Sequence, residues 1–321
     1  MRLRTAFFLV ALFLSCCAGA QQGYPARPVR LIVPYPPGGP TDLIARTVNE
    51  LLARRLGKTV VVDNRGGAAT VIGAEIAARA PADGYTLLVA TITTLAVNPA
   101  LHGTLPYHPV RDFAPISMLA AQPYVLVVHP GVPATSVSQL VAYAKAHPGK
   151  LSFASAGVGA SAHLAGEMFK HLAGIDIVHV PYKGSGPAMT DLMGGQVALM
   201  FGGISALRPH VLSGKLRVLA VSTAKRSAAA PEIPTLAEEG VSGYQTNSWN
   251  SLVAPHGTPA AVIRRLNTEI GFVLNQPDVR ERMKKQGSDP DPGTPEELAQ
   301  HIRSEIKRFA GLISAIGLKA D

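Results

Sequence analysis

The sequence predicts an α/β protein of two lobes, each an open, mostly parallel sheet with helices on both faces, joined by two crossings of the chain. Apolar strand segments alternate with helix-patterned segments along most of the chain, which is typical of parallel sheets. The alternation restarts near residue 122, which indicates a second sheet. The last part of the chain is helical without a sheet of its own, so we expect it to pack on the first sheet.

The first set of elements opens with a buried strand at Val29–Tyr35 and a helix over Thr41–Leu56, in which apolar residues recur at helical spacing. The set continues with a strand at Thr59–Asn64, a helix over Ala69–Ala80 and a strand at Tyr85–Thr91. A Pro-Ala-Asp-Gly turn at 81–84 ends the second helix. These elements predict the parallel core of a first lobe.

The second set repeats the strand-then-helix order three times and predicts a second parallel sheet. Its strands are expected at Tyr124–Pro130, Leu151–Ser155, Ile175–Tyr182, Val197–Gly202 and Leu216–Thr223. Its helices are expected at Ser136–His147, Ser161–Leu172 and Pro187–Met193.

A further strand at Trp249–Ala254 leads into the helical tail. The tail helices are expected at Pro259–Leu274, Pro277–Gln286 and Pro295–Ile316. The last of them begins with Thr294 as N-cap, a proline at the first helical position and glutamates in the first turn. If the tail covers the first sheet, the first lobe is discontinuous, and the expected domains are lobe 1 at 24–121 plus 225–321 and lobe 2 at 122–224. The crossings are then expected near Ala120–Pro123 and Val221–Lys225.

Residues 1–20 have the layout of a secretory signal peptide. Two arginines precede nine apolar residues, Ala6–Leu14, and the small residues at 18–20 form a cleavage site. The apolar run is too short to span a bilayer. We therefore expect cleavage after Ala20 and a mature protein in the periplasm. A membrane anchor and a lipid attached at Cys16 are the alternatives.

Composition narrows the chemistry of the mature chain. Both cysteines, Cys16 and Cys17, lie in the leader, so the mature chain offers no disulfide, thiolate nucleophile or cysteine metal site. Removing the two leader arginines from the 30 basic residues leaves 28 against 21 acidic ones, a net charge of +7. The basic residues are scattered and not interleaved with aromatic residues, so nucleic acid is not an expected partner. The positive balance favours anionic ligands.

Three strand-to-helix junctions combine glycines with hydroxyl side chains, at Tyr35–Asp42, Ser155–His163 and Pro181–Pro187. Each lies at the carboxyl end of a strand, where ligands bind in open α/β sheets. Helix amino termini present unpaired N–H groups and partial positive charge, and glycine lets the backbone approach a ligand closely. Three such loops, divided between two lobes, predict a cleft for a small organic anion, most simply a carboxylate.

Each loop taken alone is also what an ordinary α/β turn looks like. Thr41 is expected to cap its helix whether or not it contacts a ligand. Lys183 is the one cation of these loops, and it either pairs with the anion or is a solvated lysine.

Enzymatic alternatives find little support. Gly157-x-Gly159-x-x-Ala162 matches a dinucleotide-binding fingerprint, with Asp176 19 positions after Gly157. Asp176 opens its strand, however, whereas a ribose-binding acid belongs at the other end. The histidines lie in unrelated elements, and neither HExxH nor Gly-x-Ser-x-Gly occurs. We expect no cofactor, no metal ion and no catalysis, with His163 as a capping or packing residue.

Beyond these patterns, the chain resembles the Bug-type extracytoplasmic solute receptors of tripartite tricarboxylate transporters. The matching segments run in order from Tyr24 to about Pro255 and read YPARPVRLIVPYPPGGPTDLIAR, VVDNRGGAATVIGAEIAARAPADGYTLL, LSFASAGVGASAHLAGEMF, VPYKGSGPAMTDLMGGQVALMF and EIPTLAEEGVSGYQTNSWNSLVAP. The resemblance implies the two-lobed periplasmic-binding-protein (Venus-flytrap) fold. It also implies that the loops Tyr35–Asp42 and Ser155–His163 form a pincer on a ligand carboxylate, largely through backbone amides, hydroxyls and ordered water.

The candidate ligand-binding residues combine both arguments, and the resemblance adds Thr91, Phe201 and Gly202 as cleft walls. The full set is Tyr35, Pro37, Gly38, Gly39, Thr41, Asp42, Thr91, Ser155, Ala156, Gly157, Gly159, Ser161, His163, Lys183, Phe201 and Gly202.

The expected function is reversible capture of a small carboxylate by hinge closure, in a protein expected to be a monomer. The ligand classes implied by the resemblance are dicarboxylates, amino acids and aromatic acids. The expected partners are inner-membrane transporter subunits. A sensory receptor that passes ligand occupancy to a sensor kinase needs the same cleft, and an exported enzyme acting on a small carboxylate is the third alternative.

Overall fold

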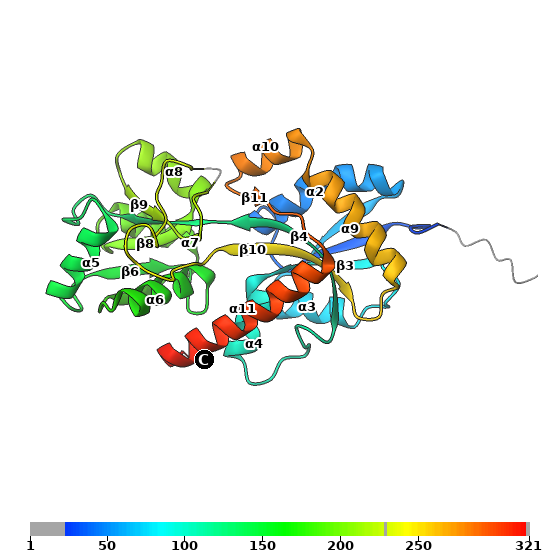
Figure 1. Cartoon of the computed structure of the whole chain (residues 1–321), viewed down its shortest axis with the longest axis horizontal. Coiled ribbons are helices and arrows are strands. Elements are labelled where there is room, and N and C mark those ends of the chain that lie inside the picture. The colour runs from blue at the N-terminus through cyan, green and yellow to red at the C-terminus, as the bar shows by residue number, and fades with distance from the viewer. Residues whose placement is uncertain (1–22, 228–229, 319–321) are drawn as a thin grey trace, which may run out of the picture.

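Two sheets form the framework of the molecule, with one six-stranded sheet in the order β11-β4-β10-β3-β1-β2 and one five-stranded sheet in the order β7-β6-β8-β5-β9. The structure is a computed structural model that describes residues 23–227 and 230–318, so the predicted signal peptide at 1–20 lies outside the described residues. We call the part around the six-stranded sheet the first lobe and the part around the five-stranded sheet the second lobe. They lie side by side in Figure 1, with β4 and β10 extending between them.

Most strands of each sheet run in one direction. The first sheet contains β1 (Val29–Val33), β2 (Val60–Asn64), β3 (Thr86–Thr91), β4 (Phe113–Gln122), β10 (Ser248–Pro255) and β11 (Asp289–Pro290). The second contains β5 (Tyr124–Val128), β6 (Ser152–Ser155), β7 (Val178–Pro181), β8 (Leu199–Gly203) and β9 (Arg217–Val221). β1 pairs in parallel with β2 and β3, and β6 with β7 and β8. One inner strand of each sheet, β10 or β5, is antiparallel to both neighbours.

The helices follow the strands much as the sequence predicts. They are α2 (Pro40–Leu56), α3 (Val71–Ala78), α4 (Asn98–Leu101), α5 (Val137–Ala146), α6 (Ser161–Ala173), α7 (Ser185–Met193), α8 (Ile204–Leu212), α9 (Ala260–Leu274), α10 (Pro277–Lys285) and α11 (Pro295–Ile316). Two of these, α4 and α8, were not predicted. Both are short, and the prolines at Pro99 and Pro209 interrupt the apolar pattern on which the prediction depends. The full length of β4 was also missed.

Helices cover both faces of each sheet because apolar residues fill successive strand positions. In β1, Leu31 and Val33 pack in a core with α2, α9 and α10, while Ile32 between them belongs to the core that contains α3 and α11. In β5, Leu126 packs on the side of α5 and α6, and Val127 on the side of α7 and α8. The fold class is therefore the predicted one.

The chain crosses between the sheets twice. The first crossing is at Pro123, which lacks an N–H group and separates β4 from β5. The second lies between the end of β9 at Val221 and the start of β10 at Ser248. The segment between them bonds to the second lobe, since the Tyr244 hydroxyl donates to the Ala165 carbonyl at 2.8 Å. The residue boundaries expected for the two lobes stay a prediction.

The tail returns to the first sheet through α11, whose Leu298 and Ile302 join its core. α11 begins as predicted, because the Thr294 side chain accepts the Glu297 N–H and the Glu297 side chain accepts the Thr294 N–H. The same helix also reaches toward the second lobe, where Arg308 donates to the Gln245 carbonyl.

Candidate ligand-binding site

The loop after β1 is organised around Gly38, which adopts a left-handed φ of 84°. Its N–H donates to Oδ2 of Asp42 at 2.8 Å. The buried Asp42 carboxylate also accepts from Nε of Arg46 at 2.8 Å and from Nδ2 of Asn64 at 2.9 Å. Burial acts to raise the pKa of Asp42, but these hydrogen bonds outweigh it and hold the pKa below its ordinary value. Asp42 is therefore an ionised group that shapes the loop, with Arg46 as its counter-charge.

α2 begins at Pro40 with Gly39 as N-cap, and no side chain caps the helix. The prediction that Thr41 is the N-cap is thus wrong. Proline suits the first helical position because its φ is fixed near the helical value, which places Thr41 inside the first turn. Within the described part of the chain, the N–H groups of Thr41 and Asp42 have no hydrogen-bond partner.

The loop after β6 repeats this arrangement in the second lobe. Gly159 has a left-handed φ of 75°, and its N–H donates to Nδ1 of His163 at 3.1 Å. As in the first loop, the glycine lies four residues before its acceptor, and the acceptor is the third residue of its helix. Among residues 23–227 and 230–318, no partner is found for the N–H groups of Ser161, Ala162 and His163. Two helix amino termini with free donors therefore begin in the same way.

His163 is buried and stacks on His179 of β7, with 3.9 Å between the ring centroids. Nε2 of His163 lies 3.7 Å from Oε1 of Glu167. Because Nδ1 accepts the Gly159 N–H, the hydrogen-bond network assigns the proton of the neutral ring to Nε2, facing Glu167. The expected capping or packing role of His163 agrees with this geometry, and two histidines that looked unrelated in the sequence form one pair.

Ser155, the last residue of β6, fixes the same loop through hydrogen bonds to Gly157. Its hydroxyl donates to the Gly157 carbonyl at 3.0 Å, accepts the Gly157 N–H at 3.2 Å and lies 2.7 Å from Nε2 of His179. The residue is fully buried. The Ala156 carbonyl accepts the Gly184 N–H at 3.2 Å, which joins this loop to the third one.

Groups from both lobes meet at Tyr124, beside the first crossing. Burial raises the pKa of Tyr124, side-chain hydrogen bonds with Ser161 and Ser248 act against this, and the nearby Tyr35 reinforces it. The Tyr35 hydroxyl lies 3.3 Å from Oγ1 of Thr91. Tyr124 is thus close to Ser161 of α6 and Ser248 of β10, and Tyr35 of the first loop lies near enough to influence its pKa. Sequence reasoning missed Tyr124 and Ser248, since neither lies in a glycine-rich motif.

A further hydroxyl cluster continues from Thr91 into the first lobe. Oγ1 of Thr94 lies 3.2 Å from Oγ1 of Thr91 and donates to Oγ1 of Thr70 at 3.0 Å. Thr70 ends the short 3₁₀ turn Ala68–Thr70, in which all three residues have positive φ. A Cβ on Gly66 would lie 3.1 Å from Cδ of Pro36, so this loop packs directly against the first one. In the sequence, the pair Gly66-Gly67 after the second strand is the signal that could have indicated this loop.

Some predicted residues lie away from this group. The Phe201 side chain is fully buried, with its ring 5.9 Å from Phe169 and 6.0 Å from Tyr244. A Cβ on Gly202 would meet Cδ1 of Leu207 at 2.7 Å, so this glycine permits packing of α8. Pro37 and Lys183 are exposed in their loops. No ion pair joins Lys183 to another described residue. The ligand contacts expected of the sixteen residues stay predictions.

The two lobes come close together at two places, each marked by a glycine. A Cβ on Gly159 would lie 3.2 Å from Cδ1 of Leu101 in α4, and one on Gly287 would lie 3.0 Å from the backbone nitrogen of Ser205 in α8. Glycine at these two positions lets the lobes approach closely.

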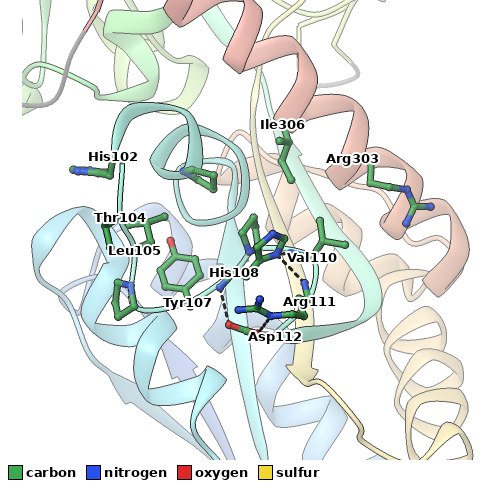
Figure 2. A pocket seen from close by; sticks show the side chains of 14 residues that line it. His102, Thr104, Leu105, Tyr107, His108, Val110, Arg111, Asp112, Arg303 and Ile306 are labelled. Atoms are coloured by element: carbon green, nitrogen blue, oxygen red, sulfur yellow. Dashed lines mark hydrogen bonds and ion pairs between the residues drawn. The ribbon is translucent and has the colours of Figure 1, made fainter.

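A separate pocket of about 570 Å³ lies on the first lobe, between the loop at 99–112 and α11. Figure 2 shows Arg303 and Ile306 on the helix side, and His102, Tyr107 and Arg111 on the loop side. None of the predicted site residues lines it. The described residues hold no group of three or more His, Cys, Asp or Glu side chains suited to a metal ion. No described helix has the length and apolar character needed to cross a membrane.

Comparison with known proteins places this geometry in a family. Residues 44–318 match the model of the tripartite tricarboxylate transporter family receptor. Protein BugT of Bordetella pertussis is 42% identical over 297 residues, covering 92% of this chain and 91% of that protein. A Rhodopseudomonas palustris protein solved with adipate is 37% identical with a TM-score of 0.81, covering 92% of this chain and 99% of that one.

Two further solved structures agree. MatC from Rhodopseudomonas palustris, solved with bound malate, is 33% identical with a TM-score of 0.76, covering 90% of this chain and all of that one. The periplasmic binding protein BugD is 35% identical with a TM-score of 0.77, at 93% and 100% coverage. The chain therefore belongs to the tripartite tricarboxylate transporter receptor family of periplasmic solute-binding proteins.

Proposed function

We propose that this protein captures a small organic dicarboxylate between its lobes in the periplasm and delivers it to an inner-membrane transporter. The observation that supports this most is the pair of equivalent helix starts at Thr41–Asp42 and Ser161–His163, whose N–H groups have no partner among the residues that the structure describes. One helix start in each lobe suits a ligand with an anionic group, because the N–H donors and the helix dipole both favour negative charge.

The ligand class is supported by the two relatives solved with adipate and malate, both dicarboxylates. Hydroxyl side chains at Tyr35, Thr91 and Ser161 add neutral donors beside the helix starts. Closure stabilises the bound state because contacts to both lobes exist only when the lobes meet.

A thermal-shift screen of the mature protein tests the proposal. Malate, adipate, other dicarboxylates, amino acids and aromatic acids are compared with neutral sugars at equal ionic strength. Saturable stabilisation by a dicarboxylate is expected, since a ligand that binds only the folded state raises its stability. Stabilisation by a sugar, together with none by any organic acid, would refute the anion claim.

One contact favours an enzymatic function instead. Oγ of Ser155 lies 2.7 Å from Nε2 of His179, as in a nucleophile paired with a base. The hydroxyl of this pair donates to the Gly157 carbonyl, however, and the serine is fully buried. A nucleophile has to reach its substrate with its proton directed to the base. Turnover of a bound acid by the pure protein would revive this rival.

Transport and sensing place the same demands on the cleft. The two roles differ in the membrane partner: a transport receptor should co-purify with transporter subunits, and a sensory receptor with a sensor kinase. Uptake of the bound acid that is lost on deletion of this protein is the result expected for transport.

A further inference from the structure

The two glycine loops are held by equivalent side chains that differ in charge. In the first lobe the acceptor of the glycine N–H is the Asp42 carboxylate, which Arg46 neutralises at 2.8 Å. In the second lobe the acceptor is an imidazole nitrogen of His163. No arginine is paired with this ring among the described residues, and its nearest charged neighbour is Glu167.

Resting on the function proposed above, we propose that His163 is a positioning residue: its neutral ring, through Nδ1, holds the Gly157–Gly159 loop so that the first N–H groups of α6 face the ligand. It does not serve as a cation for the carboxylate. A ring nitrogen can accept a hydrogen bond only when it carries no proton. Protonation of His163 would set an N–H against the Gly159 N–H and break this contact.

The titratable groups near the ring come from three segments. α6 contributes Glu167 and also Lys170, which pairs at 3.7 Å with Asp176 of the segment leading into β7. β7 contributes His179. Burial is the largest cause that lowers the pKa of His179 to about 4, and His163 adds to it. His179 therefore stays neutral at the pH values where an ordinary histidine becomes protonated.

The sign of the pH dependence separates positioning from direct charge pairing. If His163 positions the loop, protonation of its ring would weaken binding, so affinity does not rise as the pH is lowered from about 8 to about 6.5, a range in which both carboxylates of a simple diacid are largely ionised. If His163⁺ pairs with the ligand, affinity rises over the same range.

Calorimetry with malate and adipate as probes tests this with three variants. His163→Asn keeps an acceptor near the place of Nδ1 and cannot be protonated, so it should bind within about threefold of the parent at pH ~8. His163→Leu removes the acceptor and should bind about tenfold more weakly, the effect of one hydrogen bond. His171→Asn, on the exposed face of α6, should behave as the parent. Affinity of the parent that rises as the pH is lowered, or binding by His163→Asn as weak as that by His163→Leu, would overturn the proposal.

A ligand-free measurement keeps this result separate from the proposed function. Nitrogen NMR of the imidazole at pH ~8 should show His163 with Nδ1 unprotonated, and the Gly159 amide should exchange faster in His163→Leu than in His163→Asn. A proton on Nδ1 would overturn the positioning role whatever the protein binds. If neither acid binds while the NMR result holds, the positioning role stands and only the assigned ligand class fails.

Discussion

Asp42 and His163 are equivalent residues of the two lobes, since each is the third residue of its helix and accepts the N–H of a glycine four positions before it. Gly38 and Gly159 have similar left-handed φ values, 84° and 75°. The same short device therefore shapes both loops, in sheets whose sequences show no obvious repeat. Within the described ranges 23–227 and 230–318, it leaves N–H groups in the first turn of α2 and of α6 unpaired.

Asp42 should be a determinant of stability. Asp42→Ala removes a buried acceptor of three donors and should lower the free energy of unfolding by about 2–4 kcal/mol. Asp42→Asn keeps an acceptor for Gly38 and should cost about half as much. Urea denaturation at neutral pH measures both. Asp278→Ala, at an exposed acid in the first turn of α10, is the matched control and should change stability by less than about 1 kcal/mol. A cost for Asp42→Ala no larger than the control would contradict the assignment.

Gly159 should matter for closure as well as for loop shape. Gly159→Ala strains a left-handed residue, at a cost of about 1 kcal/mol, and brings a Cβ to 3.2 Å from Leu101 of the other lobe. Gly174→Ala strains a comparable residue at the end of α6, where a Cβ would meet nothing within 4 Å. Both variants should lose similar stability, but only Gly159→Ala should also bind malate or adipate more weakly. Equal affinities would show that the interlobe contact plays no part in binding.

His179 should make the protein less stable in mild acid. Its pKa is lowered from 6.5 to about 4 in the folded protein, so the unfolded chain takes up the proton first. Stability is therefore full above pH 6.5 and falls as the pH drops toward 4, by about 1–2 kcal/mol once partial exposure is allowed for. His179→Gln removes this titration. The difference in melting temperature between parent and variant should depend on pH only in that window, and a constant difference would argue against a neutral, partly buried ring.

Trp249 is the single tryptophan of the chain and reports on the junction between the lobes. It lies on β10, and its indole N–H donates to Oε2 of Glu305 on α11 at 3.1 Å. Arg308 joins this Glu305 to the Gln245 carbonyl. Binding that rotates the lobes should therefore change the fluorescence of Trp249 in a saturable way, with the midpoint found by calorimetry. No change at saturating ligand would speak against movement at this junction.

Much of the fold was accessible from sequence because it depends on local patterns. The apolar strands of both sheets and the Thr294 cap of α11 obey rules that act within a few residues. The N-cap of α2 was misassigned to Thr41 because threonine is a common N-cap residue. The preference of proline for the first helical position, which places the cap at Gly39, was not taken into account. Helix α8 was not predicted because Pro209 lies inside it and proline disfavours a helix interior.

The candidate site shows the limit more clearly. The glycine loops were found from composition, but the use of their amides was not. The resemblance implied that backbone amides of these loops contact the ligand, but not which ones. In the structure Gly157 and Gly159 donate their N–H groups to the side chains of Ser155 and His163. The pairing of His163 with His179 depends on how α6 packs against β7, and such contacts between elements have no local sequence signal.

The central claim is that the carboxylate groups are what the protein recognises. Isothermal titration of the mature protein with malate and adipate, each compared with its uncharged diamide, tests it most directly. The diamide keeps the carbon skeleton and removes the negative charge. Saturable binding of at least one diacid, with no detectable binding of its diamide, is the predicted result. Equal affinity for diacid and diamide, or binding of the diamide alone, would contradict the account.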